Sequence, residues 1–145
     1  MGAPATRAIR DNLRMEALVN IDVPDLQAAV AFYQRALGLT LSRLLFDGTV
    51  AELGGASVPI LLLQKHPGAS ALPCAPAPRD YRRHWTPVHL DFAVEHIEPA
   101  TQRALAAGAI LETPIQDFDW GRQACLADPF GHGFCLLEWK AGGYR

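Results

Sequence analysis

Residues 18–38 read LVNIDVPDLQAAVAFYQRALG, and residues 89–108 read HLDFAVEHIEPATQRALAAG. Each stretch holds a short alternating apolar run, then a polar break, then a helical pattern that ends at a glycine. Val23 corresponds to Val94 at an offset of 71 residues. A repeat of this length indicates two copies of one supersecondary unit. Because a paired module usually builds its site between the copies, matched positions should reveal the groups that matter.

The first copy predicts a strand, a helix and three further strands. Alternating apolar residues predict the first strand, Asp25 is placed to cap the helix that follows, and Gly38 is placed to end it. The pair Asp47-Gly48 is typical of a two-residue hairpin turn. The predicted elements are strand 15–23, helix 26–37, and strands 39–46, 49–53 and 58–64.

The second copy predicts the same order. Pro99 suits the first turn of its helix, and Gly108 suits the position after it. The predicted strands are 88–94, 109–116, 121–127 and 133–139. The fold class is therefore α+β, with tandem βαβββ modules. We expect an N-terminal arm (1–14), a first module (15–65), a proline-rich linker (66–84), a second module (85–140) and a tail (141–145).

Composition excludes several functional classes. The 145 residues carry a formal charge of −2, so the basic surface of a nucleic-acid binder is not expected. No apolar run approaches the about 20 residues of a membrane helix, and no signal-peptide core is visible, which favours a cytoplasmic protein without membrane or nucleic-acid partners. Cys74, Cys125 and Cys135 lack the spacing of a disulfide framework or zinc knot. The basic cluster at residues 79–84 favours a solvated loop. The alternative interpretation is a contact for an anionic ligand.

Three segments resemble the vicinal-oxygen-chelate superfamily, which includes glyoxalase I, extradiol dioxygenases and the bleomycin-resistance proteins. They are VPDLQAAVAFYQRALGL (23–39), HLDFAV (89–94) and ADPFGHGFCLLEW (127–139), and the resemblance extends over about residues 15–140. It implies curved mixed sheets, each packed on its helix by one face, around a shared cavity. Many members are dimers, so a homodimer is expected. The superfamily hosts many reactions, and the fold alone therefore identifies none.

The resemblance also implies four metal-ligand positions, one on the first and one on the last strand of each module. In this sequence they are occupied by Leu18, Leu61, His89 and Cys135. Leucine cannot coordinate a metal, and a catalytic divalent ion normally has three protein ligands. We therefore expect no standard metal site and no cofactor. Glu138 and Glu52 are alternative carboxylates, although Glu138 lies an odd number of residues from Cys135 and should point to the opposite sheet face.

His89 and Asp91 share a strand face opposite to Leu90 and Phe92. If the apolar face packs on the helices, the carboxylate can orient the imidazole as in acid–base catalysis. The alternative is that His89 and Asp91 only satisfy each other's hydrogen bonds at a strand end. His132, in the DPFGH turn, is expected to be solvated. The predicted ligand-binding residues are Leu18, Asn20, Leu61, His89, Trp120, Arg122, Cys135 and Trp139.

Three functions follow as hypotheses. The first is a protein that binds a small-molecule ligand between its modules without a standard metal site. The second is a metal-independent isomerase or lyase in which His89 is the acid or base and Asp91 orients it. The third is a metal-dependent lyase or dioxygenase with a displaced site that uses His89, Glu138 and Glu52.

Overall fold

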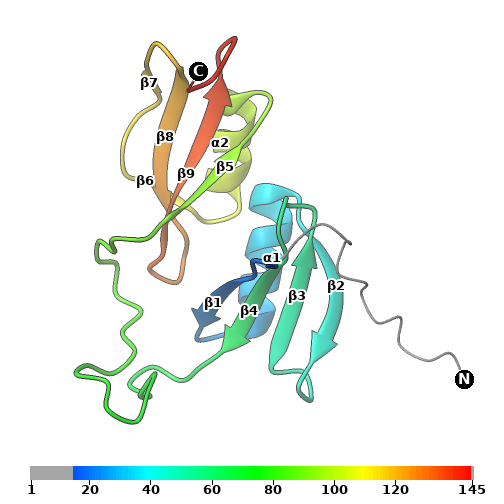
Figure 1. Ribbon diagram of the computed structural model, residues 1–145, viewed down its shortest axis with the longest axis vertical. Helices are drawn as coiled ribbons and strands as arrows, with labels where there is room; N and C mark the ends of the chain where they lie inside the picture. Colours follow the sequence, from blue (N-terminus) through cyan, green and yellow to red (C-terminus); the bar gives the residue numbers. More distant parts are fainter. Residues whose placement is uncertain (1–14, 145) are drawn as a thin grey trace, which may run out of the picture.

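The computed structural model describes residues 15–144, and the predicted arm at residues 1–14 lies outside this range. The first module forms a four-stranded sheet in the order β1-β4-β3-β2 with one helix (Figure 1). Strands β1 and β4 are parallel, and the other neighbours are antiparallel. Its elements are β1 (Val19–Val23), α1 (Leu26–Leu37), β2 (Thr40–Leu45), β3 (Val50–Gly54) and β4 (Ile60–Gln64).

The second module repeats this plan in a sheet of order β5-β9-β8-β6, with β7 also paired to β8. Again the first and last strands, β5 and β9, are parallel. The α+β class and the tandem mixed sheets predicted from the repeat are therefore confirmed. The elements are β5 (Leu90–Ala93), α2 (Ile97–Ala106), β6 (Ile110–Leu111), β7 (Gln116–Asp117), β8 (Gly121–Ala127) and β9 (Gly133–Trp139).

The last strand of each module caps the helix of the same module. In the first, Asp25 accepts a hydrogen bond from the Ala28 N–H, as predicted, and Gln64 at the end of β4 accepts one from the Leu26 N–H at 3.3 Å. In the second, Glu138 near the end of β9 accepts a hydrogen bond from the Ile97 N–H at 2.7 Å. These acceptors satisfy amide groups that a helix leaves unpaired at its start. The Glu138 carboxylate is thus engaged in capping the start of α2.

Two local predictions are wrong in detail. Leu45 pairs with Val50, so the β2–β3 connection is a four-residue loop rather than a two-residue turn at Asp47-Gly48. Phe46 and Asp47 both have positive φ there. The predicted strand at 109–116 is reduced to the short strands β6 and β7, because Pro114 between them has no N–H to donate to a ladder.

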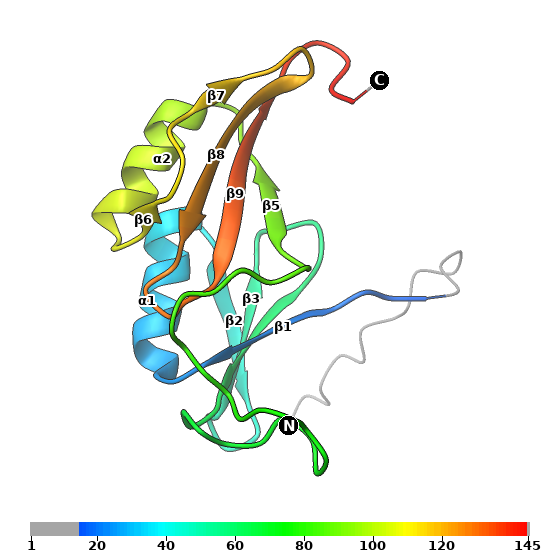
Figure 2. The same ribbon diagram turned by 90° about the vertical axis from the view of Figure 1, so that its left-hand side faces the viewer.

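Both helices lie on the same side of the two sheets and pack against each other (Figure 2). The buried residues of both modules form one core cluster. Phe32 of α1 lies at its centre, with its ring 6.3 Å from that of Phe130 and 6.4 Å from that of Phe134, both edge to face. The modules therefore meet through their helix sides, and the opposite sheet faces are left open along the molecule.

A buried polar contact joins the modules beside this core. Asp128, which is 2 % exposed, accepts a hydrogen bond from the Tyr33 hydroxyl at 2.7 Å. The amides of Phe130 and His132 donate to its other oxygen at 2.8 and 2.9 Å, and the His132 Nδ1 lies 2.8 Å from Oδ2. His132, expected to be solvated, keeps 33 % of its side chain exposed, but the tight turn folds its ring back onto the carboxylate.

The segment at residues 66–84 is attached to both modules. Arg79 contacts Asp22 of β1 at 2.6 Å, and the Tyr81 hydroxyl donates to the Lys65 carbonyl at 2.8 Å. The turn between β8 and β9 presses against it, because a Cβ added at Gly131 would lie 2.2 Å from the Tyr81 carbonyl oxygen. None of the helices in residues 15–144 is long and apolar enough to cross a membrane.

Candidate functional site

His89 and Asp91 lie on the open face of the second sheet. Leu90 and Phe92, which alternate with them, pack against the core. The His89 Nδ1 lies 3.0 Å from the Asp91 Oδ1, and the two side chains are 46 % and 34 % exposed. The imidazole, just before β5, is therefore held by the Asp91 carboxylate on that strand while one side remains accessible. An imidazole in this setting can donate or accept a proton, or bind a metal ion.

Two cysteines lie beside Asp91 on the neighbouring strands of the sheet. Asp91 is paired in register with Cys135 of β9, and Cys135 with Cys125 of β8. The Cys135 thiol lies 3.4 Å from the Cys125 sulfur. Burial raises the pKa of Cys135 to about 12, and the hydrogen bond with Cys125 acts in the same direction. Cys135 is thus a protonated thiol at neutral pH, which argues against a nucleophilic role.

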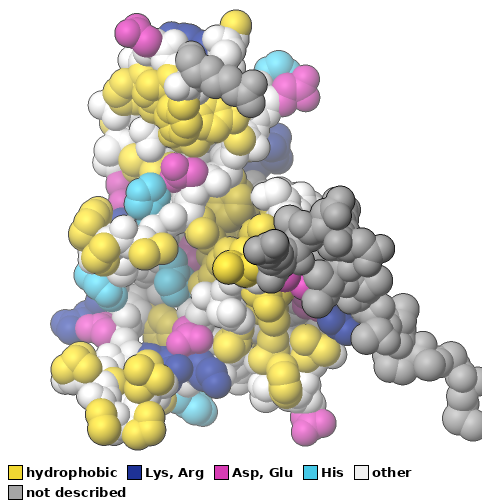
Figure 3. All heavy atoms as spheres, viewed as in Figure 1, with side chains coloured by type: hydrophobic (Ala, Val, Ile, Leu, Met, Phe, Trp, Pro, Cys, Tyr) yellow, Lys and Arg dark blue, Asp and Glu magenta, His cyan; other side chains and the backbone are white. Residues whose placement is uncertain are grey.

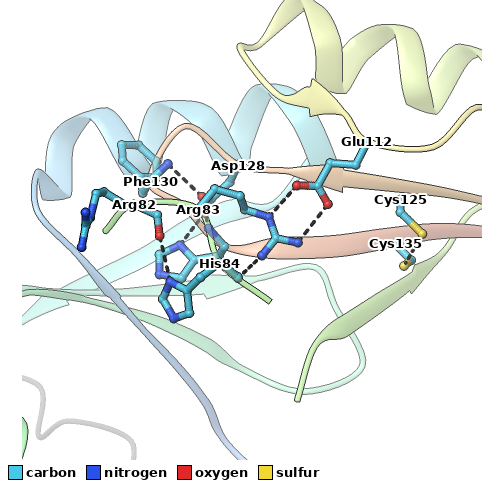
Figure 4. Close-up of polar contacts among 9 residues, drawn as sticks. Arg82, Arg83, His84, Glu112, Cys125, Asp128, Phe130 and Cys135 are labelled. Carbon is cyan, nitrogen blue, oxygen red and sulfur yellow. Dashed lines mark hydrogen bonds and ion pairs between the residues drawn. The ribbon is translucent and has the colours of Figure 1, made fainter. Parts of the chain in front are cut away.

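His89, Cys125 and Cys135 line a pocket of about 290 Å³. Its floor is the β8–β9 face with Gln123, and its rim comes from the linker and from the loop after β6. Arg83 of the linker forms two hydrogen bonds with Glu112, at 2.5 and 2.9 Å, close to the two cysteines (Figure 4). The Arg83 hydrogen bonds lower the pKa of Glu112. The rim charges are therefore matched in a pair rather than left free for an anion.

The first module contributes none of the residues that line this pocket. Leu18 is 53 % exposed just before β1, and Asn20 is paired in register with Leu61 on the other sheet. The predicted ligand-binding residues are thus divided between two separate sheet faces within one chain. A second cavity, of about 380 Å³, is lined by both modules near the ends of α1 and α2, and it contains Asp91 but not Leu18, Asn20 or Leu61.

Trp120, Arg122 and Trp139 lie away from the His89 pocket, toward the other end of the β8–β9 hairpin. Arg122 pairs with Glu98 of α2 and lies 3.7 Å from Glu138. The rings of Trp120 and Trp139 are 5.9 Å apart. They belong to an aromatic cluster at the upper end of the second module, where a hydrophobic patch is visible in Figure 3. The cluster consists of Phe118, Trp120, Trp139 and Tyr144.

The carboxylates of the displaced metal site are not brought to His89. Glu138 caps α2, and Glu52 of β3 forms an ion pair with Arg43 at 2.6 Å. Within residues 15–144, the one group of three or more potential ligands is His89, Asp91 and Cys135, whose ligand atoms lie within 4.8 Å of one another. The four positions implied by the superfamily do not fit its usual metal, because two of them are leucines.

Several pocket residues were not predicted from the sequence. Cys125 had a usable signal: strands that flank the turn at residues 128–132 place it opposite Cys135 by simple counting. Gln123 follows from the same count two residues earlier. Arg83 belongs to the basic cluster noted at residues 79–84, but its pairing with Glu112 had no sequence signal, because 29 residues separate the two and only the folded linker brings them together.

A family model described as a glyoxalase-like domain matches residues 18–137. Uncharacterized proteins of Mycobacterium bovis and Mycobacterium tuberculosis are 44 % identical over 52 residues, which is 35 % of this chain and 34 % and 31 % of theirs. The match therefore spans about a third of the length of these relatives.

Solved structures of the same superfamily share the fold. A glyoxalase/bleomycin resistance protein/dioxygenase family enzyme of Burkholderia phytofirmans has a TM-score of 0.67 at 21 % identity, covering 85 % of this chain and 97 % of that one. The fosfomycin resistance protein FosX of Listeria monocytogenes has a TM-score of 0.67 at 19 % sequence identity, and the match covers 92 % of this chain and 99 % of that one. TnmS3, an antibiotic binding protein of a Streptomyces species, has a TM-score of 0.64 at 21 % sequence identity, and the match covers 90 % of this chain and 100 % of that one. With the family model matching most of its length, the chain belongs to the glyoxalase-like domain family, within the vicinal-oxygen-chelate superfamily.

Proposed function

We propose that this protein binds a small organic molecule in the pocket above β8 and β9. The observation that carries the proposal is the pocket itself: about 290 Å³, floored by the sheet and rimmed by the linker and the loop after β6. This is the lower end of the size range of small-molecule sites. Its lining combines polar groups at fixed positions, such as His89 and Gln123, with the apolar Phe134 and Leu126. One similar fold, TnmS3, is described as an antibiotic binding protein, which supports a binding role.

The test is saturation-transfer NMR of the full chain with a library of small polar fragments. Gln123→Trp fills the pocket floor, and Gln102→Trp makes the same change on an exposed face of α2. We expect some fragments to bind the wild type and Gln102→Trp equally and to lose their signal with Gln123→Trp, while the melting curves show that both variants fold. Equal fragment signals in all three proteins, or none in the wild type, would reject the pocket as the binding site.

A second candidate function is metal-independent isomerase or lyase chemistry. It is favoured by the 3.0 Å contact between His89 and Asp91, which leaves the second imidazole nitrogen available to move a proton on a bound carbonyl compound. Its test is deuterium uptake from D₂O next to the carbonyl of simple 2-hydroxy carbonyl compounds, followed by NMR. His89→Ala should abolish the exchange, and His66→Ala, a change at an exposed linker histidine, should not. Exchange that survives in His89→Ala excludes this role.

The proposal also includes a second copy of the chain. Leu18, Trp85 and Val88 are 53 %, 74 % and 81 % exposed, and Trp85 stands at the rim of the His89 pocket. A homodimer that covers the open sheet faces would shield these side chains and complete the pocket wall. Sedimentation equilibrium should give twice the chain mass for the wild type, and Val88→Asp should weaken the association. A wild type that sediments as a monomer at all concentrations rules this out.

A further inference from the structure

Cys125 and Cys135 are neighbouring thiols on the pocket floor, and the function proposed above gives them no chemical task. They lie directly opposite each other on β8 and β9, and their sulfur atoms are 3.4 Å apart (Figure 4). We propose that they form a redox-active dithiol, which is oxidised to a disulfide by a small peroxide that enters the pocket. The proposal goes beyond the binding of an organic molecule and does not depend on it.

The backbone holds the two cysteines in a geometry that a disulfide can adopt. The Cys125 N–H donates to the Thr113 Oγ1 at 3.0 Å, and the Cys125 carbonyl accepts from the Glu112 and Thr113 amides. Both backbone groups of Cys125 therefore point away from β9, so Cys125 and Cys135 form a non-hydrogen-bonded pair. In such a pair the Cα atoms are about 4.5 Å apart, which lies within the range found in disulfides. The sulfur atoms need to approach by only about 1.4 Å to form the bond.

The two thiols differ in access, and this difference sets the order in which they react. Cys125 is half-buried, whereas Cys135 is only 6 % exposed. Burial also raises the pKa of Cys135 to about 12, so this thiol is a poor nucleophile toward molecules in solution. Cys125 should therefore meet the peroxide first. Cys135 then reacts with a sulfur that is already beside it, so no diffusional encounter is required.

Both steps balance with hydrogen peroxide as the oxidant. The Cys125 sulfur attacks one peroxide oxygen, the O–O bond breaks, and the thiol proton leaves with the second oxygen as water, which gives a sulfenic acid. The Cys135 sulfur then attacks the Cys125 sulfur, the S–O bond breaks, and the Cys135 proton leaves with the hydroxyl group as a second water. Two electrons pass from the thiols to the peroxide, and a thiol reductant reverses the change.

The experiment treats the reduced full chain with stoichiometric hydrogen peroxide, followed by N-ethylmaleimide labelling in denaturant and tryptic mass spectrometry. Both cysteines fall in one tryptic peptide, residues 123–140. We expect this peptide to escape labelling and to weigh two hydrogen atoms less than the reduced, unlabelled peptide, and dithiothreitol to restore both labels. In the Cys135→Ser variant the reaction should stop at the Cys125 sulfenic acid, which dimedone traps.

Cys74 supplies the matched control, because this third cysteine lies exposed in the linker. Cys74→Ser should keep the disulfide, and Cys125→Ser should leave Cys135 reduced, while melting curves show that the variants fold. The proposal is overturned if the wild-type peptide carries both labels after treatment, if Cys125 proceeds to sulfinic acid without forming the disulfide, or if Cys74→Ser abolishes the product. Fragment binding is measured on the reduced protein, so either proposal can fail alone.

Discussion

The hydrogen bond between Tyr33 and Asp128 makes the sharpest prediction about how the two modules hold together. The Tyr33 hydroxyl belongs to α1 of the first module and donates to a buried carboxylate of the second at 2.7 Å. Tyr33→Phe removes the donor and keeps the ring. A hydrogen bond to a charged group contributes about 1.5–3 kcal/mol. Because His132 Nδ1 still contacts the same Asp128 oxygen, we expect a loss of about 2 kcal/mol.

The effect has a pH signature. Burial raises the pKa of Tyr33 well above 10, and the charge of Asp128 acts in the same direction. A tyrosine of the unfolded chain ionises near pH 10. The folded state therefore binds this proton more tightly, so the stabilisation is complete below pH 10 and falls above it, by up to about 1.4 kcal/mol per pH unit. The stability difference between wild type and Tyr33→Phe should shrink as pH rises from 9 to 11.

Urea denaturation at pH 7 and at several alkaline values measures both effects. Tyr81→Phe is the matched control, because the Tyr81 hydroxyl donates to a neutral carbonyl in a more exposed place; its cost should be about 0.5–1.5 kcal/mol. At about 2–4 °C per kcal/mol, Tyr33→Phe should melt about 4–8 °C below the wild type. A loss no greater than that of Tyr81→Phe, or a difference that grows with pH, would refute the reasoning.

Two further predictions concern the turn after β8 and the cysteines. In thermal denaturation, Gly131→Ala should lose at least about 1 kcal/mol more stability than Gly68→Ala. Both glycines have positive φ, but only Gly131 lies against the Tyr81 carbonyl. Equal losses of stability in the two variants would contradict that contact. Iodoacetamide at pH 8 should label Cys74 long before Cys135 in peptide mass spectra, since a pKa of about 12 leaves only ~10⁻⁴ of the Cys135 thiol ionised. Fast labelling of Cys135 in folded protein would contradict this pKa.

What could be predicted from the sequence depended on how locally each feature is encoded. Asp25 and Gly38 act within a few residues of their own helix, and both take the predicted roles. The alternation around His89 likewise fixes which residues face the core. Arg122 pairs with Glu98 of α2, whereas its neighbour Gln123 lines the pocket, because successive residues of β8 point to opposite faces of the sheet.

Features that need two distant segments were beyond the sequence. The buried carboxylate of Asp128 meets Tyr33 across 95 residues, and no periodicity indicates such a pair. The same holds for Arg83, whose partner is chosen by the path of an irregular linker. Cys125 lies between these cases, because the short turn before β9 fixes its register with Cys135.

The linker has a consequence for dissection of the chain. Arg79 is tied to Asp22 of the first module and Arg83 to Glu112 of the second, so each half of the linker is anchored independently of the peptide between them. The segment around Leu72 is exposed, and the core and the Tyr33 contact already join the modules without it. If the chain is divided near Leu72 and the two fragments are expressed separately, they should therefore reassemble into one folded complex. This would make the protein a natural split reporter, in which reassembly signals that two fused partners have met.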